Sequence, residues 1–130
     1  MAKLTIEEII GKKNECKERK KIKKCLIHSE FLGGELEAHS LSKGDLSDVR
    51  ERMSENAEEG SHHFIFLSID DLRNSDLIKA YGCKRSIDIV DRLFNDAEKA
   101  QIIEILTELN GLTSLDPKAI YKMEIESIKN

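Results

Sequence analysis

Three helices are predicted by residues 75–111, which read SDLIKAYGCKRSIDIVDRLFNDAEKAQIIEILTELNG. The first covers Ser75 to Tyr81 and ends at Gly82, because glycine readily takes the left-handed conformation that closes many helices. Ser86 is expected to cap the second helix, since a serine hydroxyl can accept a hydrogen bond from a free amide of the first turn. The apolar face of this second helix consists of Ile87, Val90, Leu93 and Phe94.

The third helix of this stretch has the clearest beginning and end. Asn95 is expected to cap it, and Glu98 three residues later completes a reciprocal capping box. Gly111 supplies the stop. The apolar stripe between these signals consists of Ile102, Ile103, Ile105, Leu106 and Leu109. The periodicity therefore predicts a fold that is mainly helical.

A β-hairpin is predicted for residues 25–40, upstream of these helices. The pair Gly33-Gly34 permits the positive φ angles that a tight hairpin turn needs. Leu36 and Ala38 alternate with polar neighbours, as in a strand with one buried face. The glycine pair does not predict a phosphate-binding loop, because no Lys-Ser/Thr follows it.

A helix is predicted for residues 44–57, with Ser42 or Asp45 as its cap. The residues Glu-Glu-Gly-Ser at 58–61 are expected to end it. Its apolar residues recur at helical spacing and are Leu46, Val49, Met53 and Ala57.

The segment 61–69 is ambiguous from its own residues. Its apolar run, Phe64-Ile65-Phe66-Leu67, is too short for periodicity to separate a strand from a buried helix. Local propensity favours a strand, because aromatic and β-branched residues are enriched there.

The two ends of the chain carry different signals. Thr5-Ile6-Glu7-Glu8 is a capping box, and a lysine-rich arm follows it. Residues 1–24 hold nine basic and four acidic side chains, a net charge of +5. The remaining residues hold 12 basic and 21 acidic side chains, a net charge of −9. Asp116-Pro117 predicts the start of a C-terminal helix, because proline is tolerated at the first helical position.

Together these signals predict three parts. A capped helix and basic arm cover residues 1–24, and a C-terminal helix lies within 113–130. A compact domain covers 25–112, with the hairpin at 25–40 and helices over 44–111. The expected fold class is α+β and mainly α: a small helical domain of about five to six helices with an N-terminal hairpin.

The composition excludes several classes of function. Only 5% of the 130 residues are aromatic and none is Trp, which argues against base-stacking platforms and large aromatic pockets. Charged residues make up 35% of the chain, and no apolar run approaches the roughly 20 residues of a membrane span. The N-terminus lacks the apolar core and cleavage site of a signal peptide, so a cytoplasmic location is expected.

Neither a metal site nor an enzyme active site is predicted. Cys16, Cys25 and Cys83 form no close pair, which argues against a disulfide framework and against zinc-binding spacings. His62-His63 is the only tight pair of candidate ligands, and adjacent side chains point in different directions. No serine sits in a Gly-x-Ser-x-Gly turn, and no other nucleophile motif is present. No cofactor is therefore expected.

Two segments carry a pattern known from one protein family. Residues 71–83 read DLRNSDLIKAYGC, and residues 88–94 read DIVDRLF. This pattern resembles the XkdN-like phage tail assembly chaperones, found with contractile tails and prophage-like particles of Gram-positive bacteria. The family often has proline where this chain has Asp70 or Asp71 and Ser75. The positions that match are Leu72, Leu77, Ala80, Tyr81, Gly82, Asp88, Ile89, Val90, Asp91, Leu93, Phe94 and Gly111.

The resemblance implies a fold detail and a function. It implies that residues 61–69 are helical, against local propensity. It also implies a non-enzymatic protein of the bacterial host's cytoplasm that binds the long, helical tape measure protein and keeps it soluble during tail tube assembly. Such a chaperone is absent from the mature virion. The tail tube protein is a further expected partner, and homo-oligomer formation stays open.

Eight residues are candidates for binding a partner. The capped helix and the arm contribute exposed apolar and basic groups, while the matched motif contributes aromatic and apolar ones whose alternative role is core packing. The candidates are Ile6, Ile9, Ile10, Lys20, Lys21, Tyr81, Leu93 and Phe94. An alternative function is nucleic-acid binding through the arm, because clustered lysines pair with phosphates. The acidic remainder of the chain disfavours this alternative.

Overall fold

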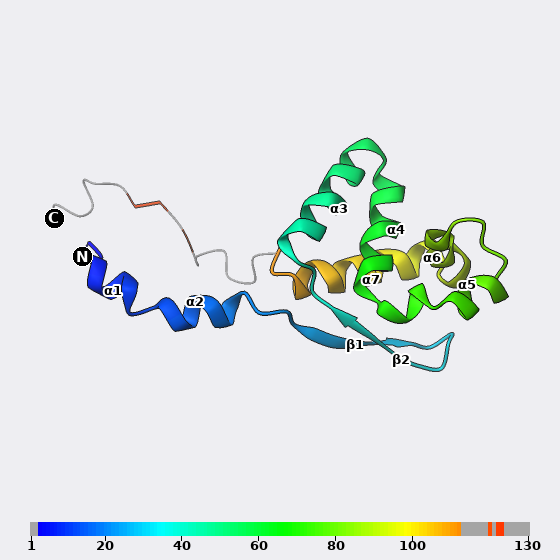
Figure 1. The fold of residues 1–130 in the computed structure, drawn as a ribbon, viewed down its shortest axis with the longest axis horizontal. Helices are drawn as coiled ribbons and strands as arrows, with labels where there is room; N and C mark the ends of the chain where they lie inside the picture. Colours follow the sequence, from blue (N-terminus) through cyan, green and yellow to red (C-terminus); the bar gives the residue numbers. More distant parts are fainter. Residues whose placement is uncertain (1–2, 113–119, 121, 124–130) are drawn as a thin grey trace. The chain divides into compact units, whose positions relative to one another are not determined.

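The structure, a computed structural model, describes residues 3–112, 120, 122 and 123. The chain divides into two units (Figure 1): residues 22–113, called the body below, and a unit of residues 1–21 with 114–130. The described residues form seven α-helices, two 3-10 helices and one two-stranded sheet. The predicted fold class is confirmed. Five of the α-helices belong to the body, and the other two belong to the arm.

Two short helices make up the described part of the arm. Helix α1 (Ile6–Ile10) begins with the predicted capping box, in which the Glu8 amide donates to Thr5 Oγ1 at 3.2 Å. Helix α2 (Lys13–Arg19) carries Lys13, Lys17 and Arg19, and the remaining basic residues of the arm lie outside it. Charge pairs one turn apart support α2, with Lys21 Nζ 2.8 Å from Glu18 Oε1. No residue of α1 or α2 is buried.

The body begins with the predicted hairpin. Strand β1 (Lys24–Ser29) pairs antiparallel with β2 (Gly34–His39), and Ile27 lies opposite Leu36. Gly33 closes the turn at φ +77°, a conformation that side chains with a Cβ atom rarely adopt. The inward face carries Ile27 and Ala38, both buried, and the outward face is polar apart from Leu26.

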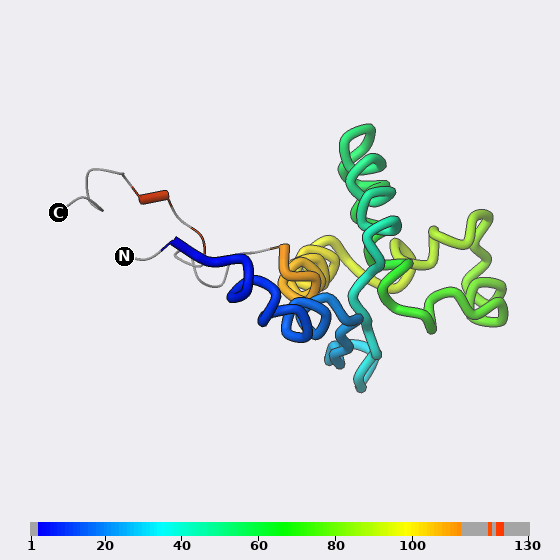
Figure 2. Tube along the Cα trace, turned by 60° about the vertical axis from the view of Figure 1, so that its left-hand side comes forward, coloured from blue at the N-terminus to red at the C-terminus, as the bar shows by residue number. Residues whose placement is uncertain are grey.

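Helices α3 (Lys43–Glu55) and α4 (Ala57–Ser68) lie side by side (Figure 2). Ser42 caps α3 as predicted, accepting from the Asp45 amide at 3.2 Å. The predicted helix end at residues 58–61 is wrong. Asn56 ends α3, and its side chain accepts from the Glu59 amide and so begins α4.

Gly60 lies inside α4 and serves close packing. A Cβ atom built on Gly60 would lie 2.3 Å from Met53 Cγ and 2.5 Å from Met53 Cα. The two helices therefore approach each other more closely than any residue with a side chain would allow. Gly60 was predicted to help end a helix, but in the structure it lies where α4 packs against α3.

Residues 61–68 are helical, as the family resemblance implies, and the strand that local propensity favours is wrong. Phe64, Ile65 and Ser68 of α4 are all buried, which a helix achieves by placing i, i+1 and i+4 on one side. Helices α3 and α7 (Asp96–Leu109) both contact α4. Burial between two helices outweighs the modest β-propensity of the run.

Short elements connect α4 to α7. They are η1 (Asp70–Arg73), α5 (Ser75–Ala80), η2 (Ser86–Asp88) and α6 (Ile89–Leu93). Gly82 has φ +65° and follows α5 as predicted. The predicted Ser86 cap is wrong. The Arg85 amide instead donates to Asp88 Oδ2 at 3.2 Å, so a carboxylate holds the turn that the serine was expected to hold.

Helix α7 confirms the capping box predicted for it. Asn95 Oδ1 accepts from the Glu98 amide and Glu98 Oε1 accepts from the Asn95 amide, both at 2.8 Å. Gly111 has φ +68°. The helix predicted within 113–130, including Asp116-Pro117, lies outside the described residues apart from three isolated positions.

The core of the body is where α4, α6 and α7 meet. Its largest fully buried side chains come from several elements. Burial of each apolar side chain contributes about 1.5–3 kcal/mol to the stability of the fold, and it requires that the other elements are packed around it. They are Ile65, Ile69, Leu72, Ile89, Val90 and Leu106. Helix α7 contacts α4 and also both strands, which places the hairpin and α7 next to each other. None of the described helices is long and apolar enough to cross a membrane.

His39 ties the hairpin to η1. Its Nε2 lies 2.7 Å from Asp70 Oδ1, and its Nδ1 lies 2.9 Å from the Ser40 carbonyl oxygen. Burial lowers the pKa of His39, but the hydrogen bonds to Ser40 and Asp70 outweigh it and raise the pKa above 6.5. Asp70, which also contacts Arg73, has its pKa lowered chiefly by the hydrogen bond from His39.

The His39→Gln substitution is expected to remove a pH dependence of stability. Because the folded-state pKa is raised, the protonated ring stabilises the fold fully below pH 6.5 and loses this effect as the pH rises through the folded pKa. The wild type should have a larger free energy of unfolding than the variant at acidic pH, and this difference should shrink by about 0.5 kcal/mol towards alkaline pH. The value is small because the Asp70 carboxylate is exposed. Urea unfolding of both proteins from pH 5.5 to pH 8.5 (about one unit below to two above the ordinary histidine pKa) measures it. A difference in unfolding free energy that does not change with pH would contradict the raised pKa of His39.

Candidate functional site

A groove lies between the hairpin and α7. It has a volume of about 430 Å³ and an apolar floor. Ile27, Phe94 and Ile102 form the closed bottom, each about 5% exposed or less. Leu36 and Ile105 line the sides, and Ile105 is 38% exposed. The groove is thus an open apolar surface that continues the core outward.

The local structure explains why these residues meet. Strand alternation sends Ile27 and its partner Leu36 to the same face of the hairpin. On α7, Ile102 and Ile105 are three residues apart and share one side of the helix. Phe94 is the last residue before the Asn95 cap, and its extended backbone directs the chain away from α6.

Acidic groups surround the groove. Glu30, Glu98 and Glu104 line it, together with the polar side chains of Ser29 and Gln101. His28 also lines it and lies 2.9 Å from Glu30 Oε1. Hydrogen bonds to Glu30 and Glu35 raise the pKa of His28. Three carboxylates beside an apolar floor favour a ligand that carries both apolar and basic groups.

A second hollow of about 290 Å³ continues the groove along α7. Its lining includes Lys23, Cys25, Glu108 and Leu109, and it shares Ile105 with the first hollow. Burial raises the pKa of the Cys25 thiol, which keeps it in the apolar, protonated form. From Glu98 to Leu109 the combined surface follows α7 for roughly 16 Å, the length of three helical turns.

The structure brings only one predicted binding residue to this groove. Phe94 lines it, at 4% exposure. Leu93 is half-buried against the core and is absent from the lining. Tyr81 follows α5 and is 42% exposed, away from the groove lining. The predicted residues of the arm, all exposed, are Ile6, Ile9, Ile10, Lys20 and Lys21.

Ile105 lines the groove but was not among the candidate binding residues predicted from the sequence. The available signal was the width of the α7 stripe, whose apolar positions cover more than one helix face. Ile102 and Leu106 are buried, while Ile105 lies at the edge of the stripe on the Ile102 side and is not fully covered. An apolar stripe wider than the core can cover leaves a surface for a partner.

A cluster of charged side chains occupies a second cleft, between α4 and the start of α7. Its volume is about 540 Å³, and its lining includes Glu58, Ser61, His62, Asp96 and Lys99. Lys99 is buried at 7% exposure and its Nζ lies 2.5 Å from Asp91 Oδ1. Burial lowers the pKa of Lys99, but the bond to Asp91 outweighs this and raises it overall. The same bond lowers the pKa of Asp91.

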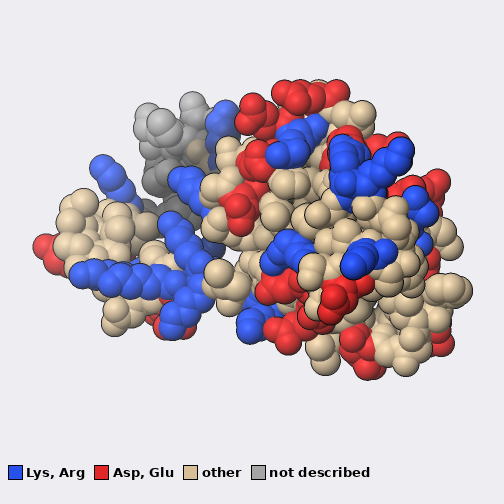
Figure 3. All heavy atoms as spheres, turned by 45° about the vertical axis from the view of Figure 1, so that its right-hand side comes forward, with Lys and Arg blue, Asp and Glu red and all other residues tan. Residues whose placement is uncertain are grey.

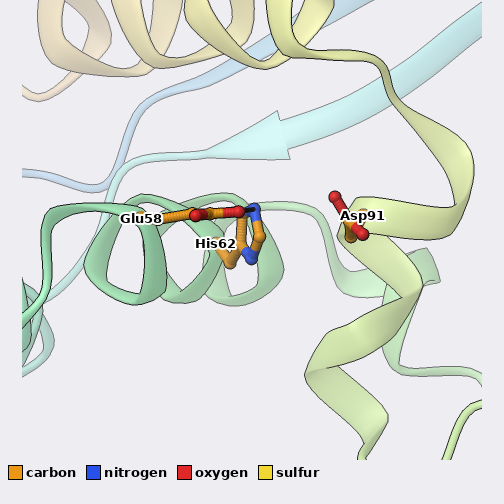
Figure 4. A group of neighbouring side chains, drawn as sticks. All are labelled: Glu58, His62 and Asp91. Atoms are coloured by element: carbon orange, nitrogen blue, oxygen red, sulfur yellow. Dashed lines mark ion pairs between the residues drawn. The ribbon is translucent and has the colours of Figure 1, made fainter.

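Glu58, His62 and Asp91 lie close together in this cluster (Figure 4). Glu58 and His62 are four residues apart on α4, and Asp91 comes from α6. Of these three residues only His62 belongs to the pair of candidate ligands predicted from the sequence, His62-His63. The four-residue spacing of Glu58 and His62 was the signal that would have found this group.

Comparisons with family models, with curated proteins and with solved structures find no match for this chain.

Proposed function

We propose that this chain is a non-catalytic assembly chaperone that holds an amphipathic helix of a longer client in the groove between the hairpin and α7. The observation that carries the proposal is the open apolar floor around Ile105, surrounded by carboxylates. The client is the tape measure protein of a phage-like tail. That choice rests on the resemblance of residues 71–94 to the XkdN-like chaperones.

The shape of the groove favours a helix as its occupant. Amphipathic helices bind grooves through apolar side chains at positions i, i+3, i+4 and i+7, which three helical turns can present. Carboxylates such as Glu30 and Glu104 would then meet lysine or arginine side chains that flank the apolar stripe. The proposed client segment is therefore an apolar helix with basic edges.

The small size of the groove suits a temporary complex. A floor built from five apolar side chains buries far less surface than a stable interface of about 1,600 Å². Individual contacts are then weak, and several chaperones along one client hold it by their number. A tail tube polymerising around the client can displace them one by one. The chaperone acts in the host cytoplasm and is absent from the finished particle, and the tube protein is a second proposed partner.

The arm is the proposed second contact with the client. Ile6, Ile9 and Ile10 of α1 are more than half exposed, an unusual density of large apolar groups on so short a helix. Figure 3 shows lysine and arginine side chains gathered on this segment, whereas both signs of charge mix on the visible face of the body. Two binding elements on one chain raise the avidity for a long client.

Co-expression with the tape measure protein of the same particle tests the proposed function. The soluble fraction of the tape measure protein should rise severalfold, and the two proteins should purify together at low salt. An unchanged soluble fraction with no co-purification at either low or high salt would contradict the proposal.

The purified protein also distinguishes the proposed chaperone from the alternative function, which is nucleic-acid binding by the arm. That function predicts affinity for DNA or RNA that falls steeply with salt and is lost when Lys20, Lys21, Lys23 and Lys24 are replaced. Two arm lysines already pair with neighbouring carboxylates, Lys12 with Glu15 and Lys21 with Glu18. The net charge of −9 on residues 25–130 repels phosphates at longer range, so the chaperone is favoured.

A further inference from the structure

The cleft beside α4 contains a buried imidazole nitrogen with no partner. His62 is only 9% exposed, and its Nε2 atom has no hydrogen-bond partner among the described residues. Glu58 Oε1 lies 3.9 Å from this nitrogen, close enough for an ion pair with a protonated ring but beyond hydrogen-bond distance. Buried polar atoms are nearly always bonded, so an exception of this kind points to a small group, a water molecule or an ion, that bonds the nitrogen in solution.

Two carboxylates complete a set of ligand atoms around this nitrogen. Glu58, His62 and Asp91 each offer one ligand atom, and these atoms all lie within 4.8 Å of one another. Ligands of one tetrahedral Zn²⁺ ion, at bond lengths of about 2.0–2.2 Å, lie roughly 3.5 Å apart. The Glu58 side chain is 76% exposed, so a change of rotamer can shorten the remaining gap without moving the backbone.

Lys99 modifies the charge of the cluster without excluding a cation. Its ammonium group bonds Asp91 Oδ1 at 2.5 Å and lies 3.6 Å from Asp96 Oδ1. The second oxygen of Asp91 stays available, and the bond to Lys99 fixes the orientation of the carboxylate, as outer partners do for metal ligands. The three carboxylates and one ammonium leave a net negative charge, which attracts a divalent ion but less strongly than the carboxylates alone.

We propose that Glu58, His62 and Asp91 form a binding site for a divalent transition metal ion, with Zn²⁺ as the best fit. One imidazole nitrogen with two carboxylate oxygens is a donor set that suits zinc better than magnesium or calcium, which prefer oxygen ligands alone. The adjoining cleft gives the ion access and leaves room for water as a fourth ligand. The ion joins α4 to α6, the two elements that carry the ligands.

Zinc titration of the untagged, chelator-treated full chain tests the site, with calorimetry as the readout. The wild type should bind one Zn²⁺ per chain and gain thermal stability with added zinc. His62→Gln should weaken the affinity by roughly thirtyfold or more, within the range that loss of metal-site contacts produces. Glu58→Gln should weaken it at least tenfold, and because Glu58 is exposed this variant keeps its fold.

His63→Gln is the matched control. His63 is the next residue on α4, and its Nε2 is already bonded to Asp48 Oδ2 at 2.8 Å. The zinc affinity of the His63→Gln variant should stay within twofold of the wild-type affinity. Co²⁺ spectra exclude the cysteines as ligands if no thiolate charge-transfer band appears. No binding by the wild type, or equal binding by the His62, Glu58 and His63 variants, would overturn the proposal. Neither result bears on the groove, which shares no lining residue with this cleft.

Discussion

Replacing Ile105 by Asp is expected to weaken binding of the helical client roughly thirtyfold, because about 2 kcal/mol of apolar burial is lost from the interface. Ile105 is the residue shared by the two hollows along α7, so a helix lying in either part of the groove contacts it. An aspartate there also brings a charge that must be desolvated in the complex. At 38% exposure, Ile105 contributes less to the fold than the buried Ile102, so the body stays folded.

Two measurements check the Ile105→Asp result. The soluble yield of the co-expressed tape measure protein should fall to its level without chaperone. Fluorescence anisotropy with a labelled apolar-basic helical peptide from the client should show the loss of affinity directly. Circular dichroism of the variant confirms that the helices remain.

Leu26→Asp is the control for this experiment. Leu26 is 69% exposed on the outward face of β1 and does not line either hollow. The substitution changes the net charge equally and also removes an exposed aliphatic side chain. Client binding should stay within twofold of the wild type. If Leu26→Asp weakens binding as much as Ile105→Asp does, or if both bind normally, the groove is not the client site.

Gly60→Ala is expected to destabilise the body by about 2 kcal/mol, although alanine is the better helix former by about 1 kcal/mol. The new Cβ atom would lie 2.5 Å from both Met53 Cα and Met53 N, so a side-chain rotation cannot relieve the clash. Helices α3 and α4 must separate, which also loosens the packing of Phe64 and Ile65 beneath them. Thermal unfolding should show a midpoint lower by roughly 10 °C.

Gly44→Ala is the matched control for Gly60→Ala. Gly44 is in α3, and a Cβ atom there would have nothing within 4 Å. The same change of residue should therefore stabilise the protein by up to about 1 kcal/mol. Two glycine-to-alanine substitutions in one helix pair are thus expected to act in opposite directions. A stabilised Gly60→Ala protein would show that the close approach of α3 and α4 does not persist in solution.

Local signals predicted the elements whose ends depend on nearby residues. The boxes Thr5–Glu8 and Asn95–Glu98 are confirmed, because a capping side chain and its amide are three residues apart and need no other part of the chain. The Gly33 turn of the hairpin is confirmed for the same reason. Ser86 failed as a cap because the amide that its hydroxyl could accept from, that of Asp88, donates to the Arg85 carbonyl oxygen at 3.0 Å instead.

The sequence by itself determined where most elements begin and end, that the fold is mainly helical with one hairpin, and that an arm of net charge +5 precedes an acidic remainder. Those features depend on hydrogen bonds and charges a few residues apart. Tertiary packing alone decided that 61–68 is helix, that Gly60 lets α3 and α4 approach closely, and that Ile105 and His62 line clefts. Such features arise where segments distant in sequence bury one another, and no local pattern records how completely each side chain is covered.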